Sequence, residues 1–150
     1  MKNLFEPNDL EFLTARITQL RPESERQWGT MTPAQALAHC SLGIQTATGE
    51  LRPQRALIGR VLGPLIKPKV VGNDEPMRRN SPTMKEIIVR SDPDFVAEQT
   101  RLINRLTRFA SAGPQGCTTH PHAFFGQLTP DEWAIVMYKH VDHHLRQFGA

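Results

Sequence analysis

Residues 129–148 read TPDEWAIVMYKHVDHHLRQF, and the first four letters of this stretch carry a helix start signal. Thr129 can accept a hydrogen bond from the backbone of Glu132, and the Glu132 side chain can return one to the backbone of Thr129. Pro130 stands at the first helical position, where its fixed φ suits a helix and its missing N–H costs nothing. Residues 32–35, TPAQ, repeat the pattern with glutamine in the last place. The two signals predict helices that begin near residues 130 and 32.

Two further helix starts have less complete signals. Asn8, which follows Pro7, is the predicted cap of a first helix. Ser91 or Asp92, before Pro93, is the predicted cap of a third. The segments that follow have apolar residues three and four apart, which is the spacing of an amphipathic helix. We therefore predict helices at about residues 8–20, 32–49, 92–111 and 130–148.

The connection between the second and third predicted helices is about 40 residues long. Within it, the apolar run EIIVR at residues 86–90 is too short and isolated to build a sheet. Residues 55–66 can hold a short helix, which Pro64 and Pro68 should stop. A connection of this length usually runs from one end of a bundle to the other, so the helices that it joins are parallel. The sequence predicts one all-α domain over residues 1–150, an up-down-down-up four-helix bundle with a long crossover between helices 2 and 3.

Composition excludes several classes of protein. Apolar residues make up 39% of the 150 residues and charged residues 22%, as in ordinary globular domains. No run of about 18 apolar residues occurs, so no transmembrane helix is expected. The first residues, MKNLFEPNDLEF, lack the apolar core of a signal peptide. Cys40 and Cys117 are accordingly expected to be free thiols, and the predicted location is the cytoplasm.

Two of the three histidines within residues 140–144 are spaced for metal binding. His140 and His144 are four residues apart, so on a helix they lie on the same face. Such a pair needs a third ligand, and the candidate is His39, which lies among small neighbours early in the second predicted helix. Three protein ligands and an open fourth position make a reactive rather than a structural metal site. The alternatives are that the pair is solvated and that His39 is a buried side chain bonded to a backbone carbonyl.

Other polar residues near the predicted site have less specific patterns. His143 can act at its edge as a proton shuttle or hydrogen-bond donor, and Gln147 can hydrogen-bond a ligand or substrate, so these two are the predicted catalytic helpers. Asp142 projects to the opposite side of the helix and is not expected to orient either ring. A rival cluster, CTTHPH at residues 117–122, offers metal-binding side chains but lies in a loop that contains a proline.

Three segments resemble a known family: HVDHHLRQFG at residues 140–149, WGTMTPAQALAHC at 28–40 and HPHAFFGQLTPDEW at 120–133. Together with the helix order, they are similar to the DinB-like superfamily of four-helix metal proteins, in particular to a branch of unassigned function. The similarity spans essentially the whole chain. It implies a divalent metal, commonly zinc or nickel, held by His39, His140 and His144. It also implies chemistry with a low-molecular-weight thiol, because characterised relatives include thiol-dependent isomerases and S-transferases.

The distribution of charge along the chain indicates what kind of molecule the protein binds. Residues 51–90 hold nine lysines and arginines against three acidic residues, a local net charge of +6 in a chain whose net charge is +3. A basic segment draped over a bundle favours an anionic small-molecule substrate, such as a carboxylate-bearing thiol. No nucleic-acid recognition motif accompanies the charge, so nucleic acid is not an expected partner. A membrane is not expected either, because no spanning segment occurs, and a homodimer is left open.

Two hypotheses about function follow from these patterns. The first is a metal-dependent enzyme, either a thiol S-transferase or isomerase or a hydrolase, whose metal faces a cleft covered by the basic crossover and by residues 120–126. Phe124 or Phe125 would then wall the pocket. The second is a non-catalytic, metal-dependent structural, sensing or dimerising module, because no carboxylate is aimed at the site as a general base.

Overall fold

The computed structural model describes residues 1–150 and is all-helical, with no strand. No helix is both long enough and apolar enough to span a lipid bilayer. Two short 3-10 segments, η1 (Lys85–Ile87) and η2 (Gly113–Gly116), accompany five α-helices: α1 (Pro7–Gln19), α2 (Pro33–Thr48), α3 (Leu57–Val71), α4 (Phe95–Ala112) and α5 (Pro130–Gln147).

Both predicted capping boxes are confirmed. The Thr32 hydroxyl accepts a hydrogen bond from the Gln35 backbone at 3.2 Å, and the Gln35 side chain accepts one from the Thr32 backbone at 3.0 Å. Thr129 and Glu132 make the same reciprocal pair, at 3.2 Å and 2.8 Å. Helices α2 and α5, the two that carry the candidate metal ligands, therefore begin where the sequence places them.

The other two predicted caps are wrong. Helix α1 begins after Glu6, whose side chain makes no capping bond, and Asn8 lies inside the helix. Helix α4 is capped by Asp94, whose carboxylate accepts from the Ala97 backbone at 2.8 Å, so it starts later than residue 92. The cap is therefore supplied by Asp94, two residues after Asp92, because it is the Asp94 carboxylate that reaches a free backbone N–H of the first turn.

Helix α3 corrects the prediction that Pro64 and Pro68 would stop a helix, because both prolines lie within it. Both are exposed, so the carbonyl groups that lose their helical partners can be hydrated. On the opposite side, Gly59 lies so close to the backbone of Phe124 that an added Cβ would be 2.7 Å from its Cα. Gly63 is also packed against the Phe124 backbone, so tertiary packing supports a helix that local propensity disfavours.

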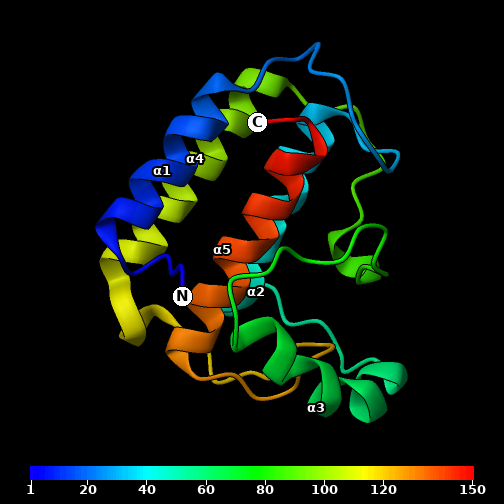
Figure 1. Ribbon diagram of the computed structural model, residues 1–150, viewed down its shortest axis with the longest axis vertical. Helices are drawn as coiled ribbons and strands as arrows, with labels where there is room; N and C mark the ends of the chain where they lie inside the picture. Colours follow the sequence, from blue (N-terminus) through cyan, green and yellow to red (C-terminus); the bar gives the residue numbers. More distant parts are fainter.

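The body of the protein is formed by helices α1, α2, α4 and α5, in which α1 and α2 each pack against α4 and α5 (Figure 1). Helix α1 lies beside α4, and α5 lies in front of α2 in this view, while α1 and α5 ascend and α2 and α4 descend. Helix α3 lies at the end where α5 begins. The core holds Leu13 and Ile17 of α1, Ile44 of α2, Phe109 of α4 and Trp133 of α5, none more than 1% exposed. Each such side chain stabilises the fold by about 1.5–3 kcal/mol relative to exposure.

The chain between α3 and α4 returns along α5 and α2. Lys139 Nζ donates to the side chain of Asn73 at 3.3 Å and to the carbonyl of Glu75 at 3.0 Å. Further along, Gln35 Nε2 donates to the carbonyl of Ser91 at 2.9 Å. Between these contacts the isolated run at residues 86–90 forms no sheet, as predicted, and Ile87 of η1 is buried.

Candidate metal centre

Three histidines converge between α2 and α5. His39 comes from α2, and His140 and His144 come from successive turns of α5. One nitrogen of each lies within 4.8 Å of the other two, a spacing at which the three rings can hold a metal ion. The Nε2 atoms of His39 and His140 are 2.8 Å apart, and the ring centroid of His39 is 4.7 Å from that of each partner. His39 is buried, whereas His140 and His144 are partly buried.

A glycine of α2 makes room for the second ring. A Cβ added at Gly43 would lie 2.7 Å from Nδ1 and 2.8 Å from Cε1 of His140. Small residues of α2 near the site were expected from the sequence to leave space for His39. The structure shows that Gly43, one turn after His39, gives its space to His140 on the facing helix.

Backbone and amide groups fix the orientation of two of the rings. The Nδ1 atom of His39 lies 2.8 Å from the carbonyl oxygen of Ile87, which can only accept, so Nδ1 carries the proton and Nε2 keeps its lone pair. Gln147 Nε2 donates to the carbonyl of Trp28 at 2.8 Å, which turns its Oε1 towards His144 Nδ1 at 2.9 Å. His144 therefore also presents Nε2 as the free acceptor. This pattern of outer hydrogen bonds is the one that orients histidine ligands in metal sites.

Electrostatics keep the three rings in the neutral form that a metal requires. Burial is the main reason that the pKa of His39 is lowered and that the pKa of His140 is well below its usual value. Burial, reinforced by the neighbouring His39, lowers the pKa of His144 to about 3. At neutral pH the rings are therefore uncharged acceptors, the state in which imidazole binds a metal.

The geometry of His39 and His140 suits a divalent transition ion. The Nδ1 atom of His140 is buried and has no hydrogen-bond partner, so this ring is held by packing and by its Nε2 side alone. The His39 and His140 Nε2 atoms, at 2.8 Å, are slightly closer than the roughly 3.3 Å that two nitrogens bound to one tetrahedral zinc ion would have. A small outward adjustment of one ring closes that difference. The residues fit such an ion.

The family model described as "Protein of unknown function (DUF1569)" matches residues 3–150. The chain belongs to this family. The matched residues include all three histidines and nearly the whole chain. No curated protein and no solved structure matches this DUF1569 chain.

His143 lies at the edge of this DUF1569 site rather than among the three converging rings. Its ring centroid is 5.1 Å from that of His144 and 5.5 Å from that of Trp28. Burial lowers the pKa of His143, and a hydrogen bond with the Met77 backbone opposes that shift. The guanidinium of Arg79 stacks over Trp28, 4.2 Å from its ring centroid. The crossover therefore brings one arginine beside the outermost histidine.

Asp142 faces away from the three histidines. Its carboxylate binds Arg16 Nη1 at 2.6 Å and Arg146 Nε at 2.7 Å. The prediction that it orients neither ring agrees with these contacts. Gln147 is 3% exposed, and both ends of its side-chain amide are hydrogen-bonded within the protein, to His144 and to the carbonyl of Trp28. A contact between Gln147 and a substrate stays a prediction.

The rival cluster at residues 117–122 is dispersed. His120 Nε2 lies 3.1 Å from the carbonyl of Pro53, and His122 Nδ1 accepts from the Phe124 and Phe125 backbones at 3.1 Å. Burial raises the pKa of the Cys117 thiol to about 11, so it is not a thiolate at neutral pH. Both cysteines are free, as predicted.

The loop at residues 120–126 is attached to α3. The carbonyl of Ala123 accepts from the Ala56 backbone at 3.0 Å, and the ring of Phe125 stacks on His122 at 4.8 Å between centroids. His122 in turn lies 5.4 Å from Trp133, near the start of α5, and it is not one of the three converging rings. A role for Phe124 or Phe125 in walling a substrate pocket stays a prediction.

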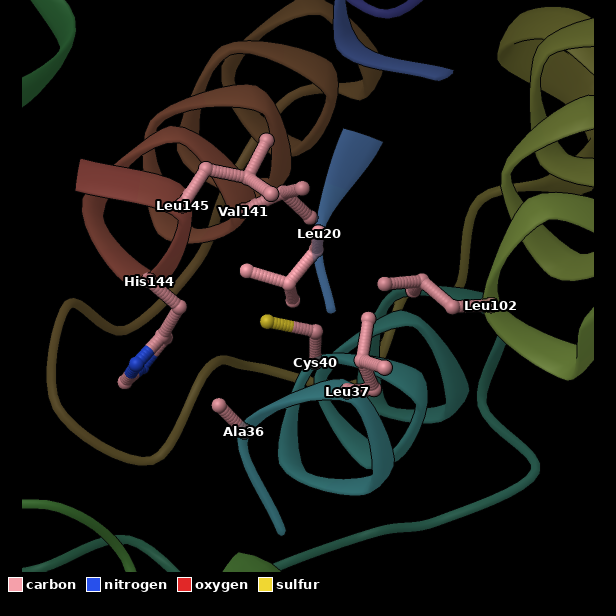
Figure 2. A pocket seen from close by; sticks show the side chains of 8 residues that line it. All are labelled: Leu20, Ala36, Leu37, Cys40, Leu102, Val141, His144 and Leu145. Atoms are coloured by element: carbon pink, nitrogen blue, oxygen red, sulfur yellow. The ribbon is translucent and has the colours of Figure 1, made fainter. Parts of the chain in front are cut away.

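A small cavity lies behind the site. Its volume is about 10 Å³, room for one water molecule at most. Seven of the eight lining residues are apolar, and Figure 2 shows His144 at the margin with its ring turned away from the apolar side chains of Leu37, Val141 and Leu145. The Cys40 thiol points into the cavity, where burial raises its pKa. This cavity is too small for a substrate.

Two groups that orient the histidines were not predicted from the sequence. The carbonyl of Ile87 belongs to the backbone, so its residue type carries no signal. Trp28 acts through its carbonyl as well, although its side chain also lies beside His143. Gln147 was predicted as a site residue because it continues the ligand face of α5. The same spacing brings its side chain into hydrogen-bond contact with His144.

Proposed function

We propose that this protein is an enzyme that binds one divalent metal ion through His39, His140 and His144. The ion would serve a reaction on a small molecule. One observation carries the proposal: three neutral imidazoles from two helices converge within 4.8 Å, two of them with Nδ1 tied to a carbonyl oxygen. Imidazole ligands suit zinc or nickel. When bound, such an ion supplies a Lewis acid that lowers the pKa of a water or thiol joining it at an open position.

The same proposal includes membership of the DinB-like superfamily and a four-helix bundle of up-down-down-up order, with α3 as an addition in the crossover. The directions of α1, α2, α4 and α5 in Figure 1 support this order. So does the position of the three histidines, which are the residues that the resemblance assigns as ligands.

The surrounding residues favour thiol S-transfer or isomerisation, with hydrolysis as the second reaction class. Arg79, held on Trp28 beside His143, offers a cation to the carboxylate of an anionic thiol. His143 is the nearest histidine outside the three and serves as the proton acceptor or donor. Gln147 holds His144 in the tautomer that binds metal.

A non-catalytic metal-dependent module is the alternative, and one observation favours it. Asp142, the acidic residue nearest the ligands in sequence, is bound to two arginines, and no carboxylate belongs to the cluster. A catalytic mechanism therefore depends on His143 or on the substrate for proton transfer.

Metal analysis of the purified protein tests the binding proposal. We expect about one zinc or nickel ion per chain and a large loss of occupancy on alanine substitution of His39, His140 or His144. His120→Ala and His122→Ala are the matched controls, because both residues are tied up elsewhere. Retention of metal by the His140→Ala, His144→Ala double variant would refute the ligand assignment.

Thiol transfer to electrophiles, measured over several low-molecular-weight thiols with and without metal, tests the catalytic part. Turnover that needs the metal and falls in Arg79→Gln for carboxylate-bearing thiols supports the enzyme. Metal binding without turnover on any thiol or ester leaves the non-catalytic module.

A further inference from the structure

Helix α3 presents an outward face of large aliphatic side chains. Leu57, Val61 and Leu65, spaced four residues apart, are 78%, 70% and 69% exposed. Beside them, Ile58 is 60% exposed and Leu62 is 38% exposed. We call these five residues the α3 face. A contiguous apolar patch of this kind on a small domain marks a surface that another body covers.

The α3 face cannot be buried by rotation of the helix. Its opposite side carries Gly59 and Gly63, and each packs directly on the Phe124 backbone. A side chain larger than hydrogen at Gly59 would lie 2.7 Å from the Phe124 Cα, so only this side of α3 fits the loop. The fold thus fixes the aliphatic side outwards, at the end of the molecule where α3 lies (Figure 1).

The charge around the α3 face has one sign. Residues 51–73 contain five lysines and arginines and no acidic residue. Arg60, which is exposed, lies to one side of the α3 face, and Lys69, also exposed, continues the row of Leu57, Val61 and Leu65 one turn further along the helix. Two acidic residues close to the ends of α3 are paired with cations: Glu132 binds Lys67 at 2.8 Å, and Asp74 faces the N-terminal ammonium at 3.9 Å.

We propose that the α3 face docks on an anionic phospholipid surface. Aliphatic side chains flanked by cations match the boundary between acyl chains and anionic headgroups, where Arg60 and Lys69 would extend to the phosphates. A second copy of the chain fits less well, since a two-fold contact brings the same cations face to face. The sequence-based expectation of no membrane partner rested on the lack of a spanning segment, which a helix lying in the interface does not need.

Vesicle co-sedimentation of the whole 150-residue chain tests this proposal. We expect binding to vesicles of phosphatidylcholine with phosphatidylglycerol, weak binding to phosphatidylcholine alone, and release by salt. The Arg60→Gln, Lys69→Gln double variant should lower the partition coefficient roughly 25-fold, about fivefold for each cation. Val61→Ser with Leu65→Ser should lower it at least about tenfold. Val96→Ser is the matched control, because Val96 is 65% exposed on α4, and it should bind as the native chain does.

The same samples distinguish the other occupants. Absence of binding to anionic vesicles by the native chain overturns the proposal, as does equal binding by the native chain and the Val61→Ser, Leu65→Ser variant. A dimer in solution that this double variant dissociates, without vesicle binding, would assign the α3 face to a second copy instead. All substituted positions are exposed, and circular dichroism confirms that each variant is folded.

Discussion

Replacing Gly43 by alanine should damage the metal site while leaving all three ligands in place. The new methyl group would lie 2.7 Å from Nδ1 of His140, whereas ordinary van der Waals contact begins at 3.4 Å. The ring must therefore move by about 0.7 Å, or the helices must separate by a similar distance. Metal–ligand distances tolerate only about 0.2 Å, so we expect the affinity for zinc or nickel to fall roughly 10- to 100-fold.

The effect on stability has two opposing parts. Alanine in a helix interior is favoured over glycine by about 1 kcal/mol, while overpacking a core costs about 1–3 kcal/mol. We expect the metal-free Gly43→Ala protein to lose about 1 kcal/mol of unfolding free energy. Competition with a chelating indicator measures the affinity, and urea unfolding of the metal-free protein measures the stability.

Ala47→Gly is the matched control for this experiment. Ala47 is fully buried one turn further along α2, and its substitution removes a methyl group without touching a histidine. It should lose at least about 1 kcal/mol of stability and keep the native metal affinity. A Gly43→Ala protein that binds metal as tightly as the native chain and is more stable would refute the placement of His140 against Gly43.

Three further outcomes are expected. Thr129→Ala removes half of a capping box and should cost about 0.5–2 kcal/mol in thermal unfolding; unchanged stability would show that this cap contributes nothing. Burial lowers the pKa of His122 from 6.5 to about 4, so the unfolded chain binds more protons in that interval, and the contribution of His122 to stability, about 3 kcal/mol, should be lost as the pH drops through it. His122→Asn keeps an acceptor and should flatten this slope in urea unfolding, and an unchanged slope would contradict the shift. Gln147→Leu removes the acceptor of His144 Nδ1 and should weaken metal binding roughly 10- to 100-fold, whereas Gln147→Glu should retain it.

Much of the helical pattern could be predicted because its causes are short-range. The boxes at Thr32 and Thr129 involve residues three apart, and the structure has both. One of the failures has a local cause and the other a long-range cause. Pro93 suggested a helix start at Asp92, yet Asp94 has the better-placed carboxylate. Pro64 and Pro68 suggested an end to α3, yet packing of Gly59 on Phe124 supports the helix beyond them.

The candidate site also has one part that short-range spacing predicts and one part that depends on long-range packing. The register of His140 and His144 on one face follows from helix geometry alone. That His39 faces this pair depends on how α2 packs against α5. His39 and His140 are 101 positions apart in the sequence. A sequence can suggest such a meeting, but side-chain spacing within one helix cannot establish it.

The sequence by itself determined where α2 and α5 begin, which face of α5 carries the histidine pair and how basic the crossover is, because each depends on residues within a few turns or on composition. Only the tertiary structure decided that Gly43 makes room for His140, that the carbonyls of Ile87 and Trp28 set the orientation of the site, and that α3 turns its aliphatic side outwards. These features arise from contacts between backbone segments that are distant along the chain. A backbone carbonyl is the same in every residue, so its position becomes informative only after the helices have packed.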